Sequence, residues 1–181
     1  MRLFIAALIP DKIQNKLANY IHSLRNNMDG VKWERPQKLH LTLKFLGEVE
    51  ESDLTEISNL VEKIVEPYSP FKMSITDFGG FPSLQNPRVL YIGLSQNKEL
   101  SKLHDKLDDG LSQIGFEKES RKFIPHITIG RVKKRMSIKD VPRISKVDFN
   151  ISQVGVVKSE LRPEGSLYTP LKVFKVNNYL I

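Results

Sequence analysis

The sequence predicts a single α+β domain over residues 1–181, with largely antiparallel sheet and helices packed on its outer faces. Two observations predict this class. Segments with the alternating pattern of strands are interspersed with three amphipathic, helix-like segments, and most of the strands follow one another without a helix between them. A His-x-Thr motif occurs twice, at His40 and at His126, which suggests two similar halves placed face to face. No Pro/Gly/Ser-rich linker separates them, so they must share an interface.

The first half is predicted to begin with a buried strand over residues 1–9. A helix follows, with Asp11 as its N-cap and apolar residues at spacings of three and four, and it ends near residues 29–30. Residues 31–33 form a short strand, and 39–47 form the first histidine strand. A second helix is predicted from a cap at Ser52 to the prolines at 67 and 70.

The second half is predicted to open with a strand over residues 71–76 and a turn over 79–83. An apolar strand over 88–94 leads to a third helix that ends at Gly115, and the second histidine strand covers 125–130. Three further strands are predicted around 147–149, 154–157 and 173–176, and the C-terminal tail has weak helical periodicity.

Composition limits the classes of protein and of partner. There are 28 Lys and Arg against 21 Asp and Glu, a net charge of +7, which mildly favours a polyanion such as nucleic acid. The absence of cysteine removes disulfides, thiolate metal sites and cysteine nucleophiles, and it agrees with a cytoplasmic protein. The apolar start is interrupted at Pro10 and no stretch of 18 apolar residues follows, so we expect neither a signal peptide nor a membrane span.

The two histidine motifs carry the predicted chemistry. On an alternating strand His40 and Thr42 share one face, and so do His126 and Thr128. Two histidines on opposite sides of a phosphate can divide acid–base catalysis: one takes a proton from water and the other gives one to the departing oxygen. The threonine hydroxyls can donate to the non-bridging phosphate oxygens. The motifs therefore predict a phosphate-cleaving site with two catalytic histidines.

This site requires no metal, and metal-ligand spacings are absent from the sequence. Threonine, the partner of each motif histidine, is a poor metal ligand. The other two histidines have simpler interpretations: His22 lies off the apolar stripe of the first helix and should be solvated, whereas His104 should belong to the core or its edge on the third helix. We therefore expect no metal.

Arg131 and Phe45 occupy equivalent places, five residues after His126 and His40. An odd spacing takes a side chain off the histidine's face, but Gly130 can permit a bulge that returns Arg131 to it. Arg131 is then a phosphate clamp; otherwise it is a surface arginine. Phe45 can stack on a nucleobase or be an ordinary core residue.

At these motifs the chain resembles the two-histidine phosphoesterases, and most closely their RNA 2′,3′-cyclic phosphodiesterase branch, also known as bacterial and archaeal 2′-5′ RNA ligase. The departures are Gly130, where alanine is usual, and the basic segment after Val132. The similarity covers most of the chain and includes residues 1–6, Trp33, 39–49, 79–83, 87–91, 123–132, 159–161 and Tyr168.

The resemblance implies two pseudo-twofold related lobes with the histidines across a central cleft. It implies hydrolysis of a terminal 2′,3′-cyclic phosphate on RNA to a 2′-phosphate, with His40 as general acid and His126 as general base. Thr42, Thr128 and Arg131 would hold the phosphate, without metal or cofactor. The family also joins such ends to a 5′-hydroxyl. We expect a monomer with no membrane partner.

Two other functions stay open at this stage. One is hydrolysis of a small cyclic nucleotide or of ADP-ribose cyclic phosphate, with little dependence on RNA length. The other is an RNA-end binding protein without catalysis, which the presence of both histidines disfavours.

Overall fold

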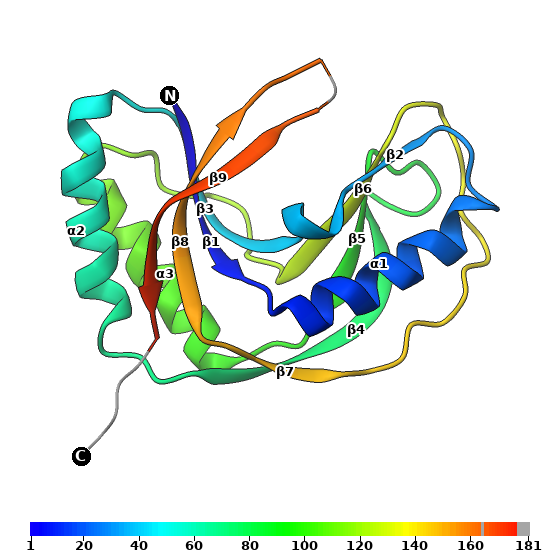
Figure 1. Ribbon diagram of the computed structural model, residues 1–181, viewed down its shortest axis with the longest axis horizontal. Helices are drawn as coiled ribbons and strands as arrows, with labels where there is room; N and C mark the ends of the chain where they lie inside the picture. Colours follow the sequence, from blue (N-terminus) through cyan, green and yellow to red (C-terminus); the bar gives the residue numbers. More distant parts are fainter. Residues whose placement is uncertain (164, 177–181) are drawn as a thin grey trace.

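The structure, a computed structural model, describes residues 1–163 and 165–176. Its strands form one antiparallel nine-stranded sheet that is bent into two lobes (Figure 1). The strand order is β7-β4-β5-β6-β3-β1-β8-β9, and β2 pairs with β6 outside this path. The predicted α+β class is confirmed. The strands are β1 (Arg2–Leu8), β2 (Val31–Trp33), β3 (His40–Glu48), β4 (Phe71–Phe81), β5 (Val89–Leu94), β6 (His126–Val132), β7 (Asp148–Ile151), β8 (Gln153–Glu160) and β9 (Leu167–Lys175).

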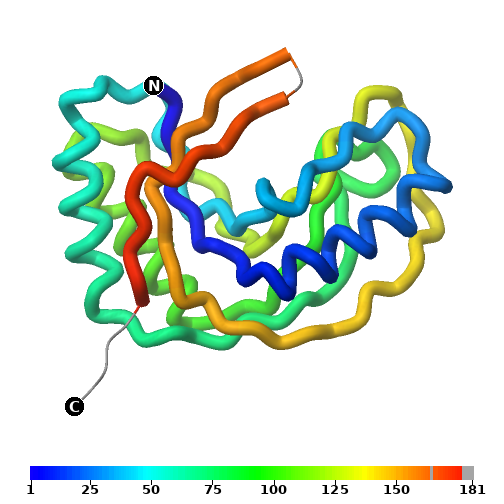
Figure 2. Tube along the Cα trace, in the orientation of Figure 1, coloured from blue at the N-terminus to red at the C-terminus, as the bar shows by residue number. Residues whose placement is uncertain are grey.

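The two lobes do not correspond to the two halves of the chain. One lobe combines β1 and β3 with β8 and β9 and is covered by α2 (Leu54–Val65) and α3 (Lys98–Gln113). The other combines β4, β5, β6 and β7 with β2, and α1 (Asp11–Arg25) lies across it (Figure 1). Figure 2 shows the early and late parts of the chain side by side where β1 pairs with β8. The lobes are therefore interwoven.

The lobes meet where β3 pairs with β6 through a single residue pair, Leu41 and Ile127. Both side chains are fully buried in the core that runs through the molecule. Because each lies one residue after a motif histidine, this pairing brings the two motifs next to each other.

The helices follow their sequence signals closely, with differences at the ends. In α3 the side chain of Asn97 accepts from the amides of Glu99 and Leu100 at 2.8 and 3.1 Å, and Gly115 ends the turn with φ +96°. Asp11 is the first residue of α1 rather than its cap, which is Pro10. Helix α1 also ends at Arg25, earlier than predicted, because a turn and Gly30 with φ +79° redirect the chain.

Three other boundaries were wrong. Ser52 lies in a 3₁₀ turn (Glu51–Asp53), and α2 begins after it. The turn predicted over residues 79–83 is largely strand: β4 runs to Phe81 because Gly79 leaves room for the ring of Tyr91, which would clash with a Cβ there. Strand β9 begins at Leu167, well before residue 173, because it pairs with all of β8. The tail's predicted helical periodicity falls outside the described residues.

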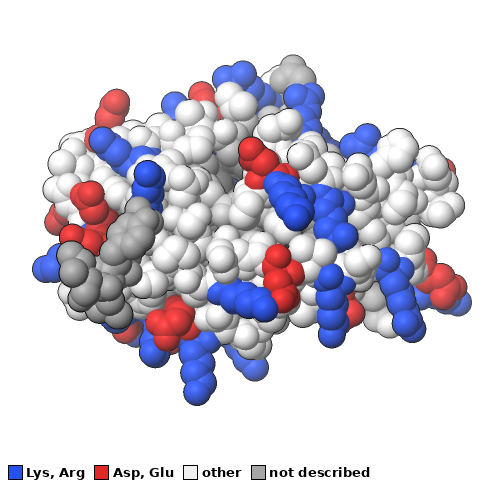
Figure 3. Space-filling model, turned by 60° about the horizontal axis from the view of Figure 1, so that its bottom comes forward, with Lys and Arg blue, Asp and Glu red and all other residues white. Residues whose placement is uncertain are grey.

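Charges do not gather into one patch on the face in Figure 3, where Lys and Arg alternate with Asp and Glu. The excess of positive charge therefore forms no single basic patch on that face. No helix in residues 1–163 and 165–176 is long and apolar enough to cross a membrane.

Candidate active site

A bulge in β3 places Phe45 on the same face as His40 and Thr42. Strand β1 pairs with β3 through Leu8–His40, Ala6–Thr42 and Phe4–Phe45. The register shifts between Ala6 and Ile5, so Leu43 has no partner on β1. One extra residue reverses the alternation beyond it. Phe45 is 65% exposed, so the alternative that it is a core residue is wrong.

The same arrangement occurs in β6, where it returns Arg131 to the face of His126. Strand β5 pairs with β6 through Gly93–His126, Tyr91–Thr128 and Val89–Arg131. Ile129 has no partner, which makes it the extra residue, next to Gly130. The bulge that the odd spacing of Arg131 required is therefore present, and the two motifs are equivalent in backbone as well as in sequence.

These two faces border a cleft of about 1000 Å³. The predicted residues that line it are Thr42, Phe45, His126, Thr128 and Arg131. His40 is not a lining residue, but its Nε2 lies 3.1 Å from the hydroxyl of Thr42. The structure thus brings all six predicted residues together. Arg88, directly before β5, also lines the cleft and was missed, because nothing in the neighbouring sequence distinguishes it from a surface arginine.

Each motif histidine is oriented by the carbonyl two residues before it. Nδ1 of His40 lies 2.6 Å from the oxygen of Lys38, and Nδ1 of His126 lies 2.7 Å from the oxygen of Ile124. A carbonyl oxygen only accepts, so Nδ1 carries the proton in both rings. Nε2 is then the nitrogen left for acid–base chemistry, and in His40 it accepts a hydrogen bond from Thr42.

A phenylalanine and a tyrosine pack against each histidine. His40 lies 4.8 Å from Phe4 and 5.2 Å from Tyr168, measured between ring centroids. His126 lies 5.0 Å from Phe81 and 5.3 Å from Tyr91. These four aromatic residues come from four different strands, so the spacing within any one strand could not assign them to the site. They fix the ring positions and keep water from one side of each imidazole.

This packing makes the neutral form of both histidines more stable. Burial is the main cause that lowers the pKa of His40 from 6.5 to about 4; the Lys38 carbonyl opposes it, and the positive charge of Arg131 adds to it. Burial likewise lowers the pKa of His126, against the effect of the Ile124 carbonyl. Without substrate, both rings are therefore neutral at pH 7.

Arg131 is half exposed, and its Nε lies 3.9 Å from a carboxylate oxygen of Glu34. This weak contact leaves the terminal guanidinium nitrogens available for an anion. The other two histidines agree with their predictions: His22 is exposed, and His104 is buried on α3, although it is also one of the residues that line the cleft. Within the described part of the chain, no three His, Asp or Glu residues are grouped so that they could hold a metal ion.

Comparison with known proteins identifies the class of protein. The family model described as LigT like Phosphoesterase matches residues 8–91 and again 92–168. The chain belongs to this family, so the predicted family and the predicted class of enzyme, a phosphodiesterase, are confirmed. The two matches also agree with the two equivalent motifs.

Individual relatives match over nearly the full chain. It is 37% identical to the RNA 2′,3′-cyclic phosphodiesterase of Methanocaldococcus jannaschii, over 95% of this chain and 99% of the relative. It is 36% identical to the protein of that name from Archaeoglobus fulgidus, over 97% and 100%. Among solved structures, a Thermus thermophilus protein has a TM-score of 0.83 at 29% identity, covering 97% of this chain and 98% of that one. E. coli LigT complexed with 3′-AMP has a TM-score of 0.80 at 26% identity, covering 97% of both chains.

Proposed function

We propose that this protein hydrolyses the 2′,3′-cyclic phosphate at the end of an RNA to a 2′-phosphate, using His40 and His126 as acid and base. The observation that carries the proposal is the matched geometry of the two histidines, each held through Nδ1 with Nε2 left for the reaction. Thr128 and Arg131 line the same cleft. The names of the relatives support RNA as the substrate class.

In the proposed reaction His126 accepts a proton from a water molecule whose oxygen attacks phosphorus. The bond from phosphorus to O3′ breaks, and His40 donates a proton to O3′, leaving a 2′-phosphate and a 3′-hydroxyl. The threonine hydroxyls and Arg131 donate to the non-bridging oxygens, where negative charge grows. Exchange with solvent then restores both histidines.

The general acid must be protonated, whereas the free protein holds both histidines neutral. A bound phosphate supplies the missing charge, because a nearby anion favours imidazolium and raises the histidine pKa. Protonation of His40 would therefore accompany substrate binding. Ligation would be the same displacement with an RNA 5′-hydroxyl in place of water, and it would leave a 2′-5′ linkage.

The decisive experiment is turnover of an oligonucleotide that ends in a 2′,3′-cyclic phosphate, with the product resolved as 2′- or 3′-phosphate. His40→Ala and His126→Ala should each lower kcat by about 10²–10⁴-fold while the protein stays folded. His22→Ala, at an exposed histidine, is the matched control and should keep full activity. Activity within about tenfold of the parent in either motif variant would exclude the two-histidine mechanism.

A leaving-group test assigns the two roles. A cyclic substrate in which sulfur replaces O3′ needs no general acid, because a thiolate leaves without a proton. It should restore turnover to His40→Ala and not to His126→Ala. The opposite result would exchange the acid and base roles while leaving the site intact.

A second candidate is hydrolysis of a small cyclic nucleotide, favoured by the solved complexes of E. coli LigT with 3′-AMP and with ATP. Equal kcat/KM for a cyclic mononucleotide and for a longer RNA would favour it. Binding of the RNA end without any turnover would instead indicate a protein that only binds. A monomeric state and a cytoplasmic location remain expectations from the sequence.

A further inference from the structure

The catalytic residues occupy only part of the cleft. The loop between α3 and β6, residues 114–125, supplies another part of its wall, with Glu119, Arg121, Lys122, Phe123 and Ile124. A cleft of about 1000 Å³ is at the upper end of the range for small-ligand sites, larger than a single cyclic phosphate and its ribose require. The loop therefore offers contacts beyond the reacting group.

The chemistry of this wall fits the next part of an RNA chain. Arg121 and Lys122 are exposed cations, and no ion pair within the described residues neutralises either of them. Ile124 is 44% exposed, and Phe45 stands 65% exposed in the same cleft. Cations beside exposed apolar and aromatic side chains are the combination that binds single-stranded nucleic acid, through phosphates and base faces.

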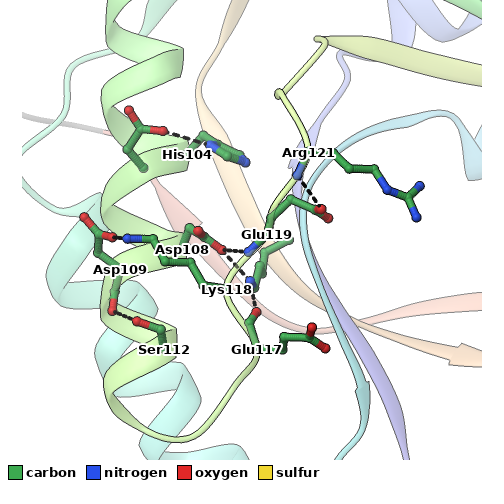
Figure 4. Close-up of polar contacts among 10 residues, drawn as sticks. His104, Asp108, Asp109, Ser112, Glu117, Lys118, Glu119 and Arg121 are labelled. Atoms are coloured by element: carbon green, nitrogen blue, oxygen red, sulfur yellow. Dashed lines mark hydrogen bonds and ion pairs between the residues drawn. The ribbon is translucent and has the colours of Figure 1, made fainter.

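A buried ion pair, Lys44–Asp108, holds the loop. Lys44 is 5% exposed, and its ammonium donates to a carboxylate oxygen of Asp108 on α3 and to the carbonyl of Glu117. The same carboxylate oxygen accepts from the amide of Glu119 at 3.1 Å (Figure 4). Lys44 directly precedes Phe45 on the same side of the β3 bulge, so the alternation of the strand turns the two side chains to opposite faces, although Lys44 also contributes to the lining of the cleft. Strand β3 thus supplies both Phe45, which lines the cleft, and Lys44, which holds the loop between α3 and β6 on the other side of the cleft.

Two further contacts fix the part of the loop that lines the cleft. The carboxylate of Glu119 accepts from the amide of Arg121 at 3.0 Å, and the Arg121 side chain points away from α3 (Figure 4). Phe123 stacks on His104, with ring centroids 4.0 Å apart and an angle of 16° between planes. The loop is therefore preorganised before any ligand binds, which reduces the ordering cost of binding.

We propose that the α3–β6 loop is a second nucleotide subsite, which binds the phosphodiester and base that precede the cyclic phosphate, and that Lys44 and Asp108 are its positioning residues. This inference rests on the proposed function. Arg121 and Lys122 pair with the internal phosphate, and the exposed apolar side chains support the base. The subsite makes the enzyme prefer a strand end over a mononucleotide.

The test compares a 2′,3′-cyclic mononucleotide with a dinucleotide that ends in the same cyclic phosphate, so that the substrates differ by one phosphodiester and one nucleoside. The parent should have the higher kcat/KM on the dinucleotide. In Arg121→Gln/Lys122→Gln this preference should fall roughly tenfold, mainly through KM, as expected for lost charge-assisted contacts. The dependence of the dinucleotide KM on salt should weaken as well.

The buried pair is tested by Lys44→Met/Asp108→Leu, which removes both charges together and leaves neither one buried alone. The same loss of preference should appear. The matched control is Lys118→Met/Asp109→Asn, which breaks an exposed ion pair between the same loop and helix, whose residues do not line the cleft. The control should keep the preference.

An unchanged preference in Arg121→Gln/Lys122→Gln would overturn the subsite, and this result does not depend on whether the core variant folds. An equal loss of preference in the control would overturn the role of the buried pair. Failure of the proposed function is distinguishable, because the parent would then turn over neither substrate.

Discussion

Replacing His40 by asparagine should make the stability of the protein less dependent on pH. The folded structure lowers the pKa of His40 from 6.5 to about 4, chiefly through burial. Between these two values the unfolded chain binds a proton that the folded protein excludes. The free energy of unfolding therefore rises with pH through this window, and the contribution is lost as the pH falls toward 4.

The size of the effect follows from the two pKa values. Between pH 7.5 and pH 4.5, a group with these values changes the free energy of unfolding by about 2.5 kcal/mol. His126 acts in the same direction, because burial lowers its pKa too. The parent should therefore lose more than this amount on acidification, and the asparagine variant should lose about 2.5 kcal/mol less than the parent.

The assay is urea unfolding of parent and variant at both pH values. Comparing the pH effect within each protein cancels any change in packing that the substitution causes. His22→Asn, at an exposed position on α1, is the control and should retain the parent's pH dependence. The reasoning would be refuted if the His40 variant lost as much stability on acidification as the parent.

Three other perturbations test the site. Arg131→Lys should lower kcat/KM for a cyclic-phosphate dinucleotide roughly tenfold, because lysine cannot form two parallel bonds to phosphate; equal values would show that Arg131 is not a ligand. Gly130→Ala should lower the free energy of unfolding by about 1–3 kcal/mol, because the new Cβ would lie 2.8 Å from Val31 and 3.1 Å from Trp33. Val31→Ala should recover part of this loss in urea unfolding, and additive effects would contradict the clash. EDTA should leave the rate unchanged; a loss that a divalent ion restores would reveal a metal requirement.

Local patterns were sufficient for the elements and for the central residues of the site. Alternation alone places His40 with Thr42 and His126 with Thr128, because the side-chain period of a strand does not depend on its neighbours. The repeated motif predicted a shared site, and the structure places both copies at one cleft. Helix α3 was also predicted, since its apolar periodicity and its terminal Gly115 are local signals; its cap at Asn97 was identified only in the structure.

Tertiary structure decided what depends on partners distant in the chain. The bulges that turn Phe45 and Arg131 into the cleft are defined by the pairing of β3 with β1 and of β6 with β5. The sequence could therefore suggest a bulge at Gly130, but it could not show that the bulge forms. The alternative of a buried Phe45 was wrong for the same reason. Likewise, the sequence around Gly79 predicts a turn, but in the structure Gly79 lies in β4, where the ring of Tyr91 on the neighbouring strand occupies the space that a side chain would need.

What the sequence by itself determined is therefore the fold class, the run of elements and the two motifs that bear the chemistry. Only the tertiary structure decided that the lobes interweave the two halves of the chain, which aromatic rings pack against each histidine, and that Lys44 pairs with Asp108. The physical reason is that side-chain direction along a strand is a local property, whereas register, burial and the partner of a buried charge are set by residues that come together only when the chain folds.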